Sequence, residues 1–141
     1  MLVLHGPNLN LLGTREPEIY GARTLAEIDA HLHEIGQREG LEVETHQSNH
    51  EGVLIDHLHT ACERCAGVVI NPGAYTHTSI ALRDAVSAIV IPVIEVHLSN
   101  TLAREVFRHV SHVGAVAAGR IEGFGPLGYE LALVALARRI R

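Results

Sequence analysis

Short runs of apolar, mostly β-branched residues alternate along this chain with longer segments in which apolar residues recur at helical spacing. The short runs predict strands near residues 2–5, 41–47, 67–71, 88–96 and 113–118. The longer segments predict helices near residues 24–38, 51–65, 76–87, 101–110 and 126–140. Because strands and helices alternate, we expect an α/β fold whose parallel sheet has helices on both faces. The expected architecture is flavodoxin-like, a single domain over residues 1–141 with a five-stranded parallel sheet in the order 2-1-3-4-5.

Local signals mark the starts of two of these helices. Thr24 with Glu27, and Ser48 with Glu51, each fit a capping box, in which the first side chain accepts from the backbone of the fourth residue. Both pairs stand directly before segments of helical periodicity. We therefore expect helices to begin next to Thr24 and Ser48.

One connection is longer than the others. Residues 6–23 separate the first strand from the first helix and contain Arg15 and Tyr20. Long connections in compact domains are usually functional. A plain surface excursion is the alternative, but an arginine and a tyrosine beyond the carboxyl end of a strand favour a place in an active site.

Two polar clusters follow buried strands of the predicted sheet. One reads Asn71-Pro72-Gly73-Ala74-Tyr75-Thr76-His77, and the other reads Glu95-Val96-His97-Leu98-Ser99-Asn100. Ligands of open α/β sheets bind beyond the carboxyl ends of the strands, where these clusters fall. Glu95 and His97 lie two apart on a strand and share a face. A carboxylate beside an imidazole fixes its tautomer and makes it a better general acid, although a purely structural buried pair is the alternative.

The second cluster also suggests an anion site. Ser99 and Asn100 fit the N-cap of the helix predicted near residues 101–110, whose free backbone N–H groups suit a carboxylate. Arg104 and Arg108 are four residues apart on that helix, so one of them could turn toward the anion. A solvated helix face is the alternative for both.

Composition excludes several classes of protein. The chain has 141 residues, of which 47% are hydrophobic and 19% are charged, which is typical of a globular domain. A net charge of −5 argues against non-specific nucleic-acid binding. The sequence predicts neither a membrane span nor a secretory signal, so we expect a cytoplasmic protein. All 11 basic side chains are arginine, which excludes Schiff-base chemistry through lysine and requires any carbanion to form as an enolate held by hydrogen bonds.

Three other motifs carry less weight. Gly123-Phe124-Gly125-Pro126-Leu127-Gly128 fits the dinucleotide fingerprint, but no strand is predicted after its helix, so a tight turn is the better interpretation. Cys62 and Cys65 fall late in a predicted helix, where the dipole opposes a reactive thiolate. The 11 histidines show no zinc-binding spacing. We therefore expect neither a metal nor a cofactor.

Taken together, these motifs resemble the type II 3-dehydroquinate dehydratases. The resemblance covers nearly the whole chain. Besides the two polar clusters, it rests on Gly6-Pro7-Asn8-Leu9-Asn10-Leu11-Leu12-Gly13, Arg15-Glu16-Pro17, Tyr20-Gly21, Thr78-Ser79, Ala81-Leu82-Arg83-Asp84-Ala85 and Gly123-Phe124-Gly125. It implies reversible dehydration of 3-dehydroquinate to 3-dehydroshikimate, in the shikimate pathway or in quinate breakdown. It also implies that no metal or cofactor is used and that the chain forms a homo-oligomer, a dodecamer of four trimers.

The resemblance also implies roles for matching residues. Tyr20 would remove a proton next to the ketone, and the charge of Arg15 would favour the tyrosinate form. Asn8, through a bound water, would stabilise the enolate, and His97 would protonate the departing C1 hydroxyl while Glu95 orients it. The matching binding positions are Asn71, His77, Asp84, Leu98, Ser99 and Arg108. Of these, Ser99 would take the substrate carboxylate and Arg108 a ring hydroxyl, Leu98 would contribute backbone, and Asp84 would come from a neighbouring subunit.

Some residues depart from the commoner family pattern, and other functions remain open. The departures are Leu102, Val110, His112, Ala118 and Arg120, which we expect to affect subunit packing more than chemistry. One alternative is a non-catalytic flavodoxin-like module, either an FMN carrier or a signal receiver, although a receiver needs an aspartate where this chain has Asn71. Another is a paralogue that binds quinate-like acids without turnover. Such a paralogue should have lost Tyr20, Arg15 or His97, and all three are present.

Overall fold

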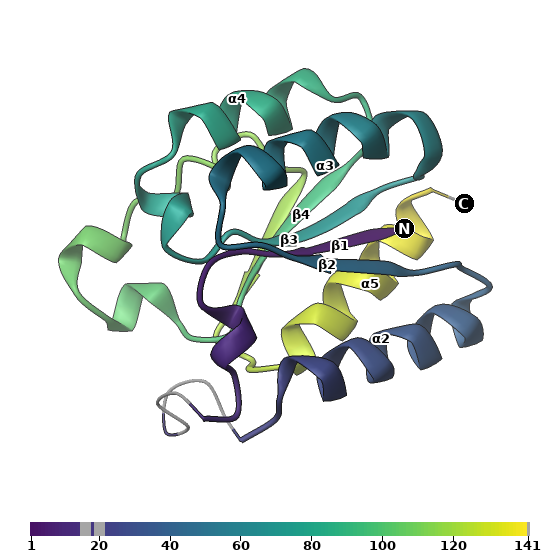
Figure 1. Cartoon of the computed structure of the whole chain (residues 1–141), viewed down its shortest axis with the longest axis horizontal. Coiled ribbons are helices and arrows are strands. Elements are labelled where there is room, and N and C mark those ends of the chain that lie inside the picture. The colour runs from purple at the N-terminus through teal and green to yellow at the C-terminus, as the bar shows by residue number, and fades with distance from the viewer. Residues whose placement is uncertain (15–17, 19–21, 141) are drawn as a thin grey trace.

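The sheet has the strand order expected from the sequence. The structure, a computed structural model, describes residues 1–14, 18 and 22–140 (Figure 1). Its described part contains a five-stranded parallel sheet in the order β2-β1-β3-β4-β5. The strands are β1 (Leu2–His5), β2 (Glu44–Gln47), β3 (Val68–Asn71), β4 (Val93–His97) and β5 (Gly119–Glu122). The predicted order 2-1-3-4-5 is therefore confirmed.

Helices cover both faces of this sheet. On one face lie α2 (Leu25–Glu39) and α5 (Leu127–Arg139), and on the other lie α3 (Glu51–Arg64) and α4 (Ile80–Ala88) (Figure 1). Single 3-10 turns complete the connections: η1 (Leu9–Leu11), η2 (Gly73–His77), η3 (Thr101–Ala103) and η4 (Val106–Arg108). This arrangement is the expected flavodoxin-like fold. None of the helices in the described part of the chain has the length and apolar character needed to span a bilayer.

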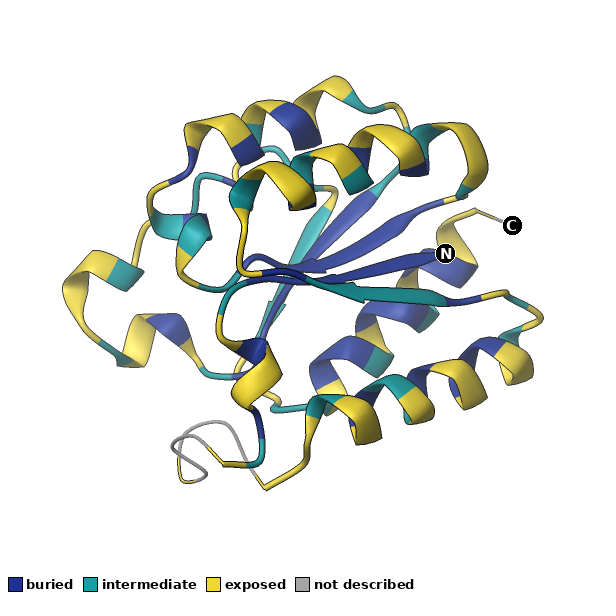
Figure 2. Cartoon of the chain, viewed as in Figure 1, coloured by how far each residue is buried: buried dark blue, intermediate teal, exposed yellow. Residues whose placement is uncertain are grey.

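Side chains alternate along the strands, so the core forms two layers, one on each face of the sheet. The central strands are coloured as buried in Figure 2. Val3 and Val69 pack with Leu133 on the side of α2 and α5, whereas Leu4 and Ile70 pack on the side of α3 and α4. All five side chains are fully buried. Burying a leucine or valine contributes about 1.5–3 kcal/mol, so the two layers hold the central strands firmly. The carboxyl ends of β1, β3 and β4 therefore form a stable platform.

The prediction of a helix near residues 101–110 is wrong. Two 3-10 turns, η3 and η4, occupy this stretch, and the backbone is extended at Arg104 and Glu105 between them. The apolar residues that suggested a helix stay exposed: Leu102, Val106, Phe107 and Val110. Most of the stability of a helix comes from burying its apolar face. The apolar side chains of this segment are not buried within the chain, so a regular helix is not stabilised here.

Strand and helix boundaries also need correction. The strand expected at 113–118 begins only at Gly119, because the N–H groups of Val116 and Ala117 both donate to the carbonyl of Val113 and form a turn. The predicted strand near 88–96 is β4, which begins at Val93, and the helix expected at 76–87 is preceded by η2 and begins at Ile80.

Of the two predicted capping boxes, one is present. Thr24 accepts from the N–H of Glu27, whose carboxylate accepts from the N–H of Thr24. The prediction of a capping box at Ser48 is wrong. The Ser48 hydroxyl accepts from the N–H of His50, and α3 begins at Glu51 without a side-chain cap. A serine two residues before the cap position cannot reach the orphan donors of the first helical turn.

Candidate active site

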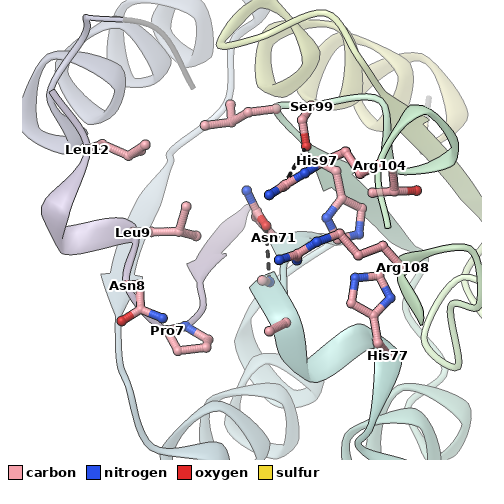
Figure 3. A pocket seen from close by; sticks show the side chains of 14 residues that line it. Pro7, Asn8, Leu9, Leu12, Asn71, His77, His97, Ser99, Arg104 and Arg108 are labelled. Atoms are coloured by element: carbon pink, nitrogen blue, oxygen red, sulfur yellow. Dashed lines mark hydrogen bonds between the residues drawn. The ribbon is translucent and has the colours of Figure 1, made fainter. Parts of the chain in front are cut away.

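A cavity of about 100 Å³ opens beyond the carboxyl ends of β1, β3 and β4 (Figure 3). The predicted site residues that line it are Asn8, Asn71, His77, His97, Leu98, Ser99 and Arg108. Residues of the η1 segment face His77 and Arg108 across this space (Figure 3). Arg15 and Tyr20 lie outside the described residues. The platform of strands thus brings together side chains from segments far apart in the sequence.

Glu95 and His97 form a buried pair in the wall of the cavity. Nε2 of His97 lies 2.7 Å from Oε1 of Glu95, and the Glu95 side chain is fully buried. Both residues come from β4, where side chains two apart share a face. Because the carboxylate accepts the Nε2 proton, Nδ1 is the ring nitrogen left for a ligand.

Two neutral hydroxyl groups also donate hydrogen bonds to the Glu95 carboxylate. The hydroxyls of Thr76 and Ser111 donate to it, and the N–H of Gly114 donates to Ser111 at 2.7 Å. Burial raises the pKa of Glu95, but the bonds from His97, Thr76 and Ser111 together outweigh it and hold the pKa below the ordinary value. The carboxylate is therefore ionised at neutral pH. The sequence motifs contain Thr76, whereas Ser111 reaches the site through the turn that precedes β5 and gave no signal.

His77 stands beside this pair. Its Nδ1–H donates to the carbonyl of Val110 at 2.7 Å, and its ring is 6.3 Å from that of His97. Burial lowers the pKa of His77, and the nearby positive groups His97 and Arg108 lower it further against the opposing hydrogen bond and Glu95. The ring is therefore neutral at pH 7, and its Nε2 is an acceptor for a ligand hydroxyl.

Asn71 is held by a buried hydrogen-bond network. The N–H of Gly73 donates to its Oδ1 at 3.1 Å, and its side chain also bonds the Tyr129 phenol. The Tyr129 oxygen lies 2.8 Å from Nδ1 of His5, whose Nε2 lies 2.9 Å from Oδ1 of Asp29. Burial raises the pKa of Tyr129 far above its ordinary value, and donation from Asn71 lowers it only in part. The phenol stays protonated and fixes the Asn71 amide. Sequence reasoning missed this network because its members are far apart along the chain.

The segment that was predicted to bind an anion folds differently from the prediction. Asn100 caps a single 3-10 turn by accepting from the N–H of Leu102, so no regular helix dipole stands there. Arg104 and Arg108 belong to different turns rather than one helix face, yet both line the cavity. Arg104 donates to the Ser99 hydroxyl at 3.3 Å, so its charge lies next to the residue expected to hold a carboxylate.

Asn8 stands on the opposite wall in a left-handed conformation. Its φ is 67°, and among the described residues no other non-glycine residue has a positive φ. Its N–H donates to the side chain of Asn49 at 2.9 Å. Such conformations cost free energy and cluster at functional sites, which agrees with the place of Asn8 at the cavity.

Two predicted residues do not line the cavity of their own chain. Glu95 lies behind His97 and acts on it through the hydrogen bond. Asp84 is on α4, where its exposed side chain pairs with Arg83 at 2.7 Å. Within the described residues, no group of three His, Cys, Asp or Glu side chains could hold a metal ion.

The glycine and cysteine motifs lie apart from this chemistry. Gly123 and Gly125 have φ of 88° and 57° and form the turn before α5, as the sequence predicts. Cys62 and Cys65 are free thiols at the end of α3. Positive φ is a conformation that glycine adopts at little cost, which explains the glycine-rich sequence without a nucleotide.

Comparisons with known proteins agree on one family. A family model described as dehydroquinase class II matches residues 1–137. The 3-dehydroquinate dehydratase of Ruegeria pomeroyi is 60% identical over 140 residues, covering 99% of this chain and 94% of that protein. The one from Chelativorans sp. is 62% identical over 139 residues, covering 98% and 96%. The crystal structure of type II dehydroquinase from Propionibacterium acnes superposes with a TM-score of 0.95 at 49% identity, covering 98% of this chain and 95% of that one.

Proposed function

The chain belongs to the class II dehydroquinase family and is a lyase, and we propose that it dehydrates 3-dehydroquinate to 3-dehydroshikimate through an enolate, with Tyr20 as base and His97 as acid. The observation that carries the proposal is the buried pair of Glu95 and His97, of which His97 lines the cavity. A carboxylate that accepts the Nε2 proton stabilises the imidazolium, which then donates from Nδ1. This is the arrangement that an acid for a hydroxyl leaving group requires.

The reaction divides into two proton transfers. The tyrosinate of Tyr20 takes a proton from the carbon next to the ketone, and the electron pair moves onto the ketone oxygen to give the enolate. As the enolate collapses, the bond to the C1 hydroxyl breaks, and the Nδ1 proton of His97 converts that hydroxyl into water. Tyr20 and its partner Arg15 are assigned through their sequence motif. Asn8 lies at the cavity, where it can hold a water against the enolate oxygen.

The other cavity residues suit the polar groups of this substrate. Neutral His77 offers an acceptor at Nε2, and the fixed amide of Asn71 offers a hydrogen-bond partner for a ring hydroxyl. Ser99, the backbone of Leu98 and the adjacent charge of Arg104 suit the carboxylate. Arg108, whose Nε donates to Glu105 at 2.7 Å, keeps its remaining guanidinium donors for a hydroxyl.

We also propose that the active site is completed by a neighbouring copy of the chain, in a dodecamer of four trimers. Asp84 does not line its own cavity and is exposed on α4, as expected of a residue that acts across a subunit boundary. The segment that contains η3 and η4 projects away from the sheet (Figure 1). Its side chains Leu102, Val106 and Phe107 are exposed. Exposed apolar patches of this kind mark interaction surfaces.

Ultraviolet absorbance tests the activity. When the purified chain is added to 3-dehydroquinate, absorbance should rise as the conjugated enone carboxylate forms. Pretreatment with borohydride and substrate should leave the rate unchanged, because the chain has no lysine to form an imine. A folded sample that gives no rise would contradict the proposal and favour a protein that binds quinate-like acids without turnover.

A further inference from the structure

Arg120 is a charged neighbour of Glu95 that does not line the cavity. It lies on β5 directly opposite Glu95 in the strand register. Its Nε is 3.5 Å from Oε2 of Glu95, while its terminal nitrogen donates to the Thr101 hydroxyl at 2.7 Å and to Glu122 at 2.8 Å. This Nε is a buried atom without a hydrogen-bond partner among the described residues. Arg120 therefore faces Glu95 through its charge rather than through a hydrogen bond.

The hydrogen-bond donors around the Glu95 carboxylate explain why the positive charge of Arg120 is needed. One carboxylate oxygen accepts from His97 and Thr76, and the Ser111 hydroxyl is within hydrogen-bond distance of both oxygens. Thr76 and Ser111 are neutral, so the fully buried carboxylate loses its cationic partner whenever His97 gives up its proton. A buried charge without a partner is costly. An arginine is charged at every working pH, so Arg120 supplies a cation in both states.

We propose that Arg120 is a positioning residue that acts through Glu95. It keeps Glu95 ionised after His97 has donated its proton, and it limits how tightly the pair holds that proton. The inference rests on the proposed role of His97 as the acid. From the sequence, Arg120 was expected to affect subunit packing more than chemistry. The inference instead gives this residue a role in the chemistry.

Other charged groups face the same pair from neighbouring elements. They are His77 on η2, Arg104 next to η3, Arg108 on η4 and Glu122 on β5. The first three line the cavity, whereas Arg120 does not line it and contacts Glu95 instead. All of them remain in a variant of Arg120, so a change in titration reports the loss of that cation, which faces Glu95 and also pairs with Glu122.

Titration of His97 by NMR in the full chain tests the proposal. The signal is assigned by its loss in His97→Gln. In Arg120→Gln the midpoint should move up by about one pH unit, the low end of what a neighbouring charge produces, because removal of a cation favours the protonated pair. The basic limb of the kcat profile should move with it. Arg120→Lys keeps the charge and should restore the midpoint.

A matched control removes an arginine elsewhere. Arg64→Gln removes a cation that pairs with Glu44 at 2.9 Å. Glu44 lies on β2, at the edge of the sheet opposite β5, so the His97 midpoint should stay unchanged. If Arg120→Gln does not fold, Arg120→Val is the second neutral variant, since a β-branched residue suits a half-buried strand. A folded neutral variant with an unshifted midpoint would overturn the proposal.

The titration needs no turnover, so the two proposals can fail separately. A chain that leaves 3-dehydroquinate unchanged but shows the shifted midpoint contradicts the proposed function and supports the counter-ion role. Normal turnover with an unshifted midpoint in Arg120→Gln contradicts only the counter-ion role. An equal shift in Arg120→Lys and Arg120→Gln would also overturn it, because charge would then not be the cause.

Discussion

Nε2 of His97 lies 2.7 Å from Oε1 of Glu95, and both side chains are buried, with His97 next to the cavity and Glu95 behind it. The carboxylate keeps its charge there because hydrogen bonds lower its pKa by more than burial raises it. A group that is ionised more readily in the folded than in the unfolded chain links stability to pH. The pair that we propose for catalysis therefore also contributes to folding.

The first prediction concerns the stability of Glu95→Gln. The folded pKa of Glu95 is below its ordinary value of 4.5, so its contribution is present above that pH and is lost as pH falls through the folded pKa. Urea unfolding of wild type between about pH 5.5 and about pH 3 should show a steeper loss of unfolding free energy than Glu95→Gln, which lacks this titration. Equal slopes would contradict the lowered pKa.

The second prediction concerns Tyr129, whose phenol bonds Asn71 and His5 in the core. Tyr129→Phe leaves these buried groups without that partner and should lower the unfolding free energy by about 1–3 kcal/mol. Tyr75→Phe is the matched control: its hydroxyl donates to the Asn49 carbonyl at an exposed site and should cost less. Urea denaturation measures both. A larger loss in Tyr75→Phe would show that the buried network is not held by the phenol.

The third prediction concerns Gly114, which leaves room for the acid–base pair. A Cβ at this position would stand 2.5 Å from Oε2 of Glu95 and 2.8 Å from the Ser111 oxygen. Gly114→Ala should therefore displace the carboxylate and lower kcat by about tenfold or more, within the range that acid–base catalysis supplies. Gly52→Ala, where a Cβ meets nothing within 4 Å, should keep wild-type kcat. Unchanged kcat in folded Gly114→Ala would mean that the position of Glu95 does not matter.

The fourth prediction tests whether Asp84 acts across a subunit boundary. Asp84→Ala and His97→Ala should each be nearly inactive alone. When the two variants are co-expressed, mixed oligomers should recover activity, because some sites then combine an intact Asp84 with an intact His97. The dehydration rate of the purified mixture measures this. A mixture no more active than its parents, or a fully active monomer by light scattering, would contradict a shared site.

The parallel sheet and the contact between Glu95 and His97 could be predicted because both follow from local periodicity. Apolar runs of strand length separated by helices fix a parallel sheet, and residues two apart on a strand share a face. These rules need no knowledge of distant residues. They fail where local pattern and tertiary burial disagree.

The place of Arg120 shows such a failure. Residues 113–118 are apolar enough to pass for a strand, but Val113 enters the core from a turn and β5 begins at Gly119. Because the register of a strand decides which side chains face which neighbours, the contact of Arg120 with Glu95 could not be found from the sequence. The same turn places Ser111 next to the Glu95 carboxylate. Ser111 and Arg120, two partners of Glu95, were therefore both missed because this turn was not predicted.

The most direct test of the central claim separates the two proton transfers. In deuterated water, proton NMR follows exchange at the carbon next to the ketone of 3-dehydroquinate, and absorbance follows dehydration. His97→Ala should still catalyse exchange while dehydration falls by at least about 10²-fold, the scale of a general acid, and Tyr20→Phe should lose both. Exchange that persists in Tyr20→Phe, or dehydration near the wild-type rate in His97→Ala, would contradict an enolate formed by Tyr20 and resolved by His97.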